Sequence, residues 1–418
     1  ISGGNLEGYE NGPSCHMAVS VLNHVAGNIG IKGGVIPSPE ALAPAPKFDP
    51  KNSISRFAAD AEAGKIQTLI VSGSNPVFTA PMAAKVKDAL AKIPFIASFS
   101  SYIDETAAYA DIILPSHHPL EDWGDEFSEP GAGFAPATVM QPVVSPIYNT
   151  KGLGDIFITV GKAVGGKTAA RTPSSEFKDY LRSSWKEMYS KNRAMSAGTL
   201  TFDDFWIKTL SEGGWWGGES VKPRHAAVSV HVVKEHLSKS AVAEFEGDEK
   251  AYPFYLMLYP QAAMRDGSGA LSPWLQEMPD PMTSVVWGSW VEMNNKTAAS
   301  LGISEGDVVS IESPFGKITA QAYLAPGIRP DTIAVPIGQG HKHYGRYAKD
   351  RGVNPIEILP FKENPKTGQI AVNSTRVKIT KMAGGRLVKQ EGTARELGRD
   401  IVKTMTPAEF ERIKGIKG

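Results

Sequence analysis

The chain has 418 residues, in which 44 lysines and arginines balance 44 aspartates and glutamates. This length allows about two or three domains with substantial cores, and the balanced charge gives no general attraction to nucleic acid or anionic lipid. The single cysteine, Cys15, cannot form a disulfide within the chain or complete a cysteine-built metal site, and no run approaches the ~18 apolar residues of a membrane span.

Glycine-rich segments flank a predicted helix at the start of the chain. Apolar residues over 18–25 predict a buried helix, with glycines gathered before it at 8–12 and after it at 27–34. Because glycine permits close backbone approach, these loops would contact a cofactor or pack against a neighbouring domain. The proline-rich stretch 35–50 then predicts a surface loop.

Strand and helix patterns alternate in the stretch 65–121. They predict, in order, a strand over 66–71 buried on both faces, a helix in which Met82, Val86 and Leu90 share a face, a strand over 95–99, a short helical piece over 102–110 and a strand over 111–115. This alternation describes an open parallel sheet, and ligands bind such sheets at the carboxyl ends of the strands. The polar residues that follow strand ends are Ser74, Asn75, Asp104, Glu105 and Thr106.

The middle of the chain carries weaker signals. A helix over 154–165 would close the first domain, and amphipathic patterns predict helices over 176–191 and 201–211. Trp215 and Trp216 lie between pairs of glycines. Because exposed tryptophans would form an adhesive patch, we expect them to be buried, either within their own chain or against a partner or another domain.

The pattern changes to short strands after residue 250. A strand is predicted over 254–259, a connector over 260–282, and a short helix between an Asn294 cap and Gly302. Later strands are predicted over 308–312, 317–324, 332–337 and 373–381. This regular spacing indicates an all-β unit, and a barrel is favoured over a sandwich because the embedded helix could cap one end. The tail contains one predicted helix over 407–413.

A nucleophilic triad is hard to build from this sequence, and the signals for metal binding are weak. No Gly-x-Gly-x-x-Gly fingerprint follows the first predicted strand, and the histidines at 117–118, 341 and 343 lack a carboxylate spacing that completes a metal site. We assign no catalytic residue and no metal ligand. The turn 72–76 and the loop 339–346 together suit an elongated anionic or polar ligand.

The order of several motifs resembles the molybdopterin oxidoreductases of the dimethyl sulfoxide reductase superfamily. The residues that carry the resemblance are Leu22–Gly34, Gly73–Pro76, Asp104–Ala107, Ala110–Pro115, Glu121, Val291–Val309 and the loop from Gly338. Within that family, 274–281 and 338–354 are similar to polysulfide-reductase-like enzymes, and more closely to subunits of the quinone reductase complex and of alternative complex III.

The resemblance implies an α/β fold in which a Rossmann-like open parallel sheet domain is followed by a double-psi β-barrel domain. It places the sheet domain at 1–165, a helical connector at 166–250, the barrel at 251–381 and a C-terminal arm at 382–418. In the family these units hold two molybdopterin guanine dinucleotides around molybdenum or tungsten. The residues implied to bind cofactor are Gly73, Ser74, Asn75, Pro76, Asp104, Glu105 and Thr106 from the sheet, and Gln339, Gly340, His341, Tyr344, Gly345 and Asn354 from the barrel.

The chain departs from the family in one respect. The half that carries the iron–sulfur cysteines and the metal-ligating side chain lies upstream in the family, so an N-terminal half or a partner chain would have to supply it, and Ile1 leaves processing or truncation open.

The resemblance therefore implies a subunit of a respiratory redox complex, with iron–sulfur, cytochrome c and integral-membrane quinone-binding subunits as partners, on the periplasmic side of the bacterial inner membrane. In the two most similar complexes, the quinone reductase complex and alternative complex III, the molybdenum site is lost. The alternatives are part of a catalytic molybdenum or tungsten oxidoreductase, and an unrelated α/β protein that binds a phosphorylated small molecule.

Overall fold

The computed structural model describes most of the chain. The described residues are 2–36, 42, 49, 53–127, 134–191, 195, 201–216, 243–364, 367–390 and 405–415. Most of the predicted loop 35–50, the glycines that follow Trp216 and much of the C-terminal arm lie outside them. Within these ranges no helix is both long enough and apolar enough to cross a bilayer.

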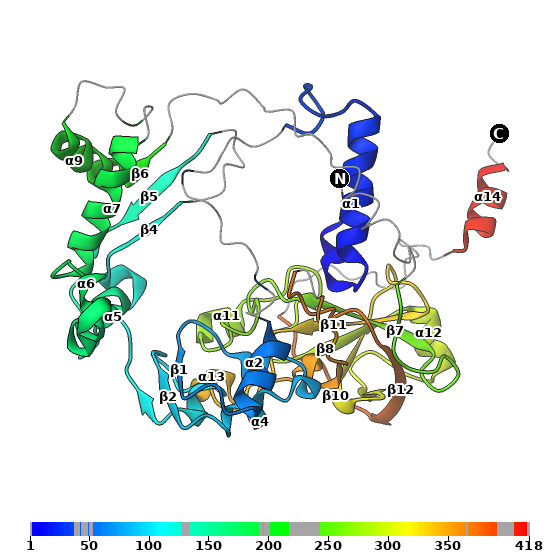
Figure 1. The fold of residues 1–418 in the computed structure, drawn as a ribbon. Coiled ribbons are helices and arrows are strands. Elements are labelled where there is room, and N and C mark those ends of the chain that lie inside the picture. Colours follow the sequence, from blue (N-terminus) through cyan, green and yellow to red (C-terminus); the bar gives the residue numbers. More distant parts are fainter. Residues whose placement is uncertain are drawn as a thin grey trace.

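Six strands form a closed barrel, which confirms the predicted all-β unit (Figure 1). In spatial order they are β10 (Gly316–Leu324), β8 (Trp290–Met293), β11 (Thr332–Ile337), β7 (Phe254–Pro260), β12 (Arg376–Ala383) and β9 (Val308–Ser313). Strand β8 was not predicted, because its short run follows an irregular connector. Strands β7 and β11 run parallel, so their carboxyl ends and the loops that follow them lie at the same end of the barrel.

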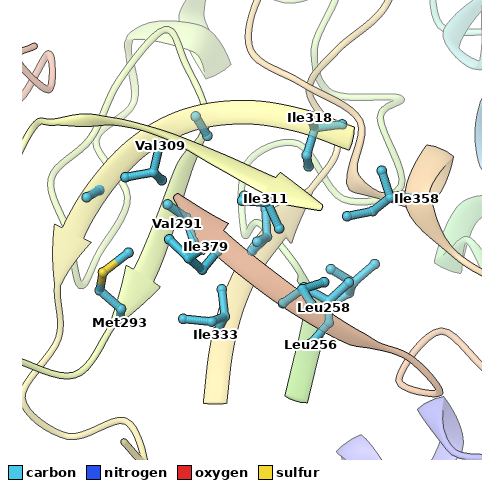
Figure 2. Packing of buried hydrophobic residues seen from close by; sticks show 14 of the residues in the cluster. Leu256, Leu258, Val291, Met293, Val309, Ile311, Ile318, Ile333, Ile358 and Ile379 are labelled. Carbon is cyan, nitrogen blue, oxygen red and sulfur yellow. The ribbon is translucent and has the colours of Figure 1, made fainter. Parts of the chain in front are cut away.

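Branched side chains fill the barrel. Alternate residues of each strand point inward, so Leu256 and Leu258 of β7 are buried while Tyr255 and Met257 between them are less so. Figure 2 shows these leucines packed with residues of other strands, among them Val291, Met293, Val309, Ile311, Ile333 and Ile379. Each fully buried side chain of this kind stabilises the fold by roughly 1.5–3 kcal/mol.

A small parallel sheet precedes the barrel, as predicted. Its strands, in spatial order, are β1 (Thr68–Val71), β2 (Phe95–Ser98) and β3 (Ile112–Ile113). The prediction that the first strand is buried on both faces is wrong: Ile70 is 48% exposed. The reason is that β1 lies at an edge of a sheet of only three strands.

Short helices precede, connect and follow the strands of this sheet. They are α2 (Ile54–Glu62), α3 (Pro76–Thr79), η3 (Met82–Ala84), α4 (Val86–Leu90), η4 (Ala107–Tyr109) and η5 (Pro119–Glu121). The single helix predicted through Met82, Val86 and Leu90 is wrong, because Lys85 adopts a φ of 53° and divides it. Val86 and Leu90 are buried as expected, whereas Met82 is 63% exposed.

A third group of elements stands apart from the barrel in Figure 1. It contains an antiparallel sheet of β4 (Gly124–Glu126), β5 (Ala137–Met140) and β6 (Gly214–Trp215), with helices α5 (Leu153–Val164), α6 (Gly166–Ala170), α7 (Phe177–Lys191) and α9 (Phe202–Glu212). The three helices predicted here are confirmed. Its core surrounds the fully buried Trp185, and Trp215 packs against this core within its own chain while Trp216 is exposed. The domain boundaries stay a prediction.

The first long helix exists but is not buried. Helix α1 (Gly12–Val25) follows η1 (Gly4–Gly8), and among its residues only Gly12 is buried, while Leu22 and Val25 are 66% and 78% exposed. The expected burial is therefore wrong, because no other described element covers this side of α1. The remaining helices are α11 (Pro273–Glu277), α12 (Asn295–Ser300), α13 (Gly345–Ala348), η6 (Pro355–Ile358) and the predicted tail helix α14 (Pro407–Gly415).

Candidate functional site

The loops that follow β1, β2 and β11 meet where the parallel sheet lies against the barrel. The residues just before α13, in the loop that follows β11, donate hydrogen bonds to Ile103 and Glu105 in the loop after β2. Hydrogen bonds join the two units here, and four of the predicted binding residues take part in them: Glu105, His341, Tyr344 and Asn354. We call this region the junction, and we define it by Asn75, Glu105, His341 and Asn354.

On the sheet side, Asn75 fixes the loop after β2 to the loop after β1. Its side-chain oxygen accepts hydrogen bonds from the backbone N–H and the hydroxyl of Thr106, at 3.1 and 2.7 Å. The Thr106 hydroxyl in turn accepts from the N–H of Val77 at 3.1 Å. The Asn75 amide then donates to Glu105 Oε2 at 2.7 Å, so no polar atom of this side chain is left unpaired.

Glu105 is the centre of the junction. Its Oε2 lies 3.0 Å from His341 Nδ1, and its Oε1 accepts from the backbone N–H groups of Lys342 and His343 at 2.8 and 3.1 Å. The Glu105 carboxylate therefore receives hydrogen bonds from both structural units. Glu105 and His341 are both buried.

Hydrogen bonding fixes the charge of this pair. His341 Nε2 lies 3.1 Å from the carbonyl oxygen of Gly267, which can only accept, while Nδ1 faces the Glu105 carboxylate. Both ring nitrogens therefore donate, and the imidazole is a cation. Burial acts to raise the pKa of Glu105, but hydrogen bonds from His341, from Asn75 and from the backbone of His343 outweigh it and lower that pKa far below its ordinary range.

The neighbouring carboxyl, Asp104, is shifted in the opposite direction. Burial raises the pKa of Asp104, although the N–H groups of Ala107 and Thr106 donate to its Oδ1 at 2.7 and 2.9 Å and partly offset the effect. The pKa values of these two adjacent carboxyls thus shift in opposite directions: Glu105 accepts hydrogen bonds from His341 and Asn75, whereas the hydrogen bonds to Asp104 come from backbone N–H groups. Through these two hydrogen bonds Asp104 holds the turn that leads into η4.

Aromatic contacts also join the sheet side of the junction to the barrel side. The rings of Phe78 and His341 are stacked, with centroids 3.7 Å apart and planes 8° apart. The carbonyl of Phe78 accepts from the side-chain amide of Asn354 at 2.8 Å, and the Asn354 side-chain oxygen accepts from the N–H of Ile356 at 3.1 Å. Tyr344 packs beside His341 and donates its N–H to the carbonyl of Ile103.

Two other predicted residues act inside the barrel loops. Gln339 pairs its amide with that of Gln276, at 2.7 Å from Gln339 Nε2 to Gln276 Oε1. Gly340 has a φ of +101°, and a Cβ there would lie 2.1 Å from the backbone nitrogen of Asn354. Only glycine fits this close approach.

The structure brings most of the predicted residues together and leaves others aside. Asn75, Asp104, Glu105, Thr106, His341, Tyr344 and Asn354 are at the junction, with Gln339 and Gly340 in the loop that reaches it. Gly73 and Ser74 are exposed after β1, Pro76 begins α3 and Gly345 begins α13. Their binding of a cofactor stays a prediction.

Sequence reasoning missed two residues of this region. Phe78 lies in an apolar run and is indistinguishable by sequence from a core residue. Gln276 offered a signal, because it is a polar residue in the apolar sequence Trp-Leu-Gln, and it is almost fully buried.

The hydrogen bonds of the junction determine whether its residues fit a pterin dinucleotide. The side-chain polar atoms of Asn75, Glu105, His341 and Asn354 already pair within the protein, so they do not fit as free ligands in this arrangement. The remaining groups are the exposed Gly73–Ser74 turn and, just after β7, the buried side-chain oxygen of Gln261, which has no hydrogen-bond partner. The described residues contain no group of three or more His, Cys, Asp or Glu side chains placed to hold a metal ion.

Comparison with known families gives two matches. Residues 1–163 match the family described as "Molybdopterin oxidoreductase", and residues 275–375 match the "Molydopterin dinucleotide binding domain". The first range contains the parallel sheet, and the second contains most of the barrel and the loop that carries His341.

Curated relatives share modest sequence identity. The chain is 28% identical over 375 residues to the "Menaquinone reductase, molybdopterin-binding-like subunit" of Nitratidesulfovibrio vulgaris, covering 87% of this chain and 50% of the relative. It is 26% identical over 353 residues to the molybdopterin-containing subunit of an arsenate respiratory reductase from a Shewanella species, covering 70% and 41%. The chain thus spans about half the length of these relatives or less.

A solved structure has the same fold. Acetylene hydratase from Pelobacter acetylenicus superposes with a TM-score of 0.51 and 15% sequence identity, covering 79% of this chain and 46% of that one. At this identity the likeness extends to the fold alone.

Proposed function

The chain belongs to the molybdopterin oxidoreductases of the dimethyl sulfoxide reductase superfamily, and from this premise we propose that it is a subunit, or the C-terminal part of one, in a respiratory redox complex. Its proposed role is to form the frame through which electrons pass to or from quinone, without a molybdenum centre of its own. This family assignment excludes the alternative that the chain is an unrelated ligand-binding protein.

The observation that carries the proposal is the pairing at the junction. In an enzyme that grips a pterin with Asn75, Glu105 and His341, these side chains would keep donors or acceptors for the ligand. Here each one is paired with the protein. A network of this kind supports a structural role, because it binds the sheet to the barrel instead of leaving a polar cradle between them.

The assembly is proposed by analogy with the relatives. The name of the relative from Nitratidesulfovibrio vulgaris describes a menaquinone reductase subunit that is molybdopterin-binding-like. We propose partners of the same kind for this chain: an upstream half or second chain that completes the fold, and iron–sulfur, cytochrome c and integral-membrane quinone-binding subunits. We propose the periplasmic side of the bacterial inner membrane as their location.

A catalytic oxidoreductase is the second candidate. It is favoured by relatives whose names denote molybdopterin-containing subunits of reductases, and by the unpaired buried oxygen of Gln261, which could accept a hydrogen bond from a bound group. In that case Gly73, Ser74 and Gln261 would hold part of a molybdopterin guanine dinucleotide, whose metal would supply the redox chemistry. The residues of this chain would bind and orient it.

Metal and pterin analysis of the native assembly separates the two candidates. The affinity-tagged chain would be isolated with its partners from a mild detergent extract, and molybdenum, tungsten and oxidised pterin would be measured per mole of chain. We expect partner subunits but no stoichiometric metal or pterin. One molybdenum or tungsten per chain, with pterin, would establish the catalytic candidate instead, and a stable monomer without partners would contradict the subunit role.

A further inference from the structure

A pocket of about 640 Å³ lies on the outer wall of the barrel, away from the junction. It is lined by Tyr9, Phe245, Tyr255, Leu256, Met257, Glu292, Gly327, Ile328, Arg329 and Thr332. Tyr255 pairs with Thr332 where β7 and β11 begin, whereas the junction loops follow the carboxyl ends of these strands. The volume falls within the range of small-molecule sites.

Aromatic rings form one side of this pocket. Phe245 makes edge-to-face contacts with both tyrosines, with centroids 6.2 Å from Tyr9 and 4.7 Å from Tyr255. The three rings come from separate parts of the sequence, and Met257 and Ile328 add apolar surface. Ring faces carry partial negative charge, so a wall of this kind attracts cations as well as apolar groups.

The one carboxylate among the lining residues belongs to Glu292. The hydroxyl of Tyr259 and the indole N–H of Trp290 both donate to Glu292 Oε1, the latter at 3.0 Å. Burial and the charge of Glu292 raise the pKa of Tyr259, so this phenol stays protonated and continues to donate. Among the described residues, Glu292 Oε2 has no hydrogen-bond partner, so a fixed carboxylate keeps one acceptor oxygen available.

The other charged residue of the lining is already neutralised. Arg329 donates to both oxygens of Asp331, at 3.0 and 2.6 Å. Glu292 is therefore the uncompensated charge among the lining residues. The protein also places a cation on this aromatic wall, because the guanidinium of Arg376 lies 4.2 Å from the ring centroid of Tyr255.

We propose that this pocket binds a small organic cation, with a planar amidinium or guanidinium group directed at Glu292 Oε2 and an apolar body against Tyr9, Phe245 and Tyr255. A carboxylate held by two donors need not reorganise to accept a cationic N–H group, and charge-assisted hydrogen bonds of this kind are among the stronger ones. The site is independent of the proposed redox role, so metal or pterin results do not bear on it.

The test compares benzamidine with its neutral isostere benzamide, by titration calorimetry of the full chain. We expect saturable binding of benzamidine that is at least about tenfold tighter than that of benzamide, since a charged hydrogen bond contributes more than a neutral one. No saturable benzamidine binding, or equal affinity for the two compounds, would overturn the proposal without any variant being needed.

Two variants locate the binding. Glu292→Gln keeps an oxygen for Tyr259 and Trp290 but removes the charge, and should weaken benzamidine binding about tenfold while leaving the weak binding of benzamide unchanged. Glu187→Gln, on an exposed face of α7, is the matched control and should bind as the parent does. If Glu292→Gln does not fold, Phe245→Leu tests the aromatic wall, with an expected loss of about threefold. Unchanged benzamidine affinity in the folded Glu292→Gln protein, or in its replacement, would place the binding elsewhere.

Discussion

Glu105 and His341 are 236 residues apart in the sequence, yet they share a buried hydrogen bond of 3.0 Å that joins the parallel sheet to the barrel. Both imidazole nitrogens donate to acceptors, and the carboxylate accepts from both units. The contact is therefore an ion pair with satisfied partners, the arrangement in which a buried pair is most sensitive to loss of one member.

Glu105→Gln should destabilise the chain strongly. The substitution keeps the shape of the side chain but removes its charge and replaces one acceptor oxygen by a donor, which leaves the His341 cation buried without a counter-charge. We expect a loss of about 3 kcal/mol in the free energy of unfolding, measured by urea denaturation. Glu187→Gln removes an exposed carboxylate that pairs with Lys191 and should leave the unfolding midpoint unchanged. Equal midpoints for the parent and Glu105→Gln would show that the ion pair contributes nothing.

The same pair predicts how stability depends on acid. Because the folded state lowers the pKa of Glu105 below its ordinary 4.5, its contribution is fully present above that value and is lost as the pH falls through the folded pKa. Folding raises the pKa of Asp104 above 3.8, so ionised Asp104 lowers the stability of the folded state, and this cost disappears as the pH falls.

The stability difference between the parent and Glu105→Gln should therefore shrink as the pH is lowered from about 6 to about 3. Urea denaturation at several pH values measures it. The variant Asp104→Asn is measured in parallel, because it removes the carboxyl whose pKa shift is opposite to that of Glu105. A difference in stability that stays constant over this range would mean that the pKa of Glu105 is the same in the folded and unfolded states.

Gly340→Ala should be among the more damaging single-atom additions in the chain. Its positive φ strains any other residue, and the added Cβ would meet the backbone of Asn354 at 2.1 Å. We expect a loss of about 2 kcal/mol or more, or failure to fold. Gly327→Ala is the matched control, since nothing lies within 4 Å of a Cβ there and its φ is not positive. Thermal unfolding of the two variants compares them, and similar midpoints would contradict the close approach.

The barrel interior should respond to a cavity. Ile311 is fully buried among the strands shown in Figure 2, so Ile311→Ala removes packed atoms that no neighbour can replace. The expected cost is about 2–5 kcal/mol in unfolding free energy. Val388→Ala shortens an exposed side chain and should change stability by no more than about 0.5 kcal/mol. If both variants unfold alike, the barrel does not form the main core.

Much of the fold could be predicted because its signals are local. The alternating branched residues of β9, β10 and β11, the Asn294 cap and Gly302 specify their elements within a few residues. Helix α1 shows where this reasoning stops. Its apolar residues predicted burial, but burial depends on what lies opposite, and sequence pattern carries no information on that partner.

The sequence predicted which residues meet at the junction but not how their polar atoms pair. Strand-end rules placed Asn75 and Glu105 together, because parallel strands place their following loops at one edge of a sheet, and the family resemblance added His341. They could not indicate that the polar atoms would pair with one another, since this depends on sub-ångström distances across the junction. Phe78 was missed for the same reason: stacking on an imidazole leaves no trace in the periodicity of α3.

The stacking of Phe78 on His341 gives the molecule an internal spectroscopic reporter. A ring current acts on protons that lie above an aromatic plane, so the carbon-bound imidazole protons of His341 should resonate upfield of those of the other histidines in a nuclear magnetic resonance spectrum. Any separation of sheet from barrel would return these signals to ordinary positions. Local opening between the two units could thus be followed at a single residue, without unfolding the chain.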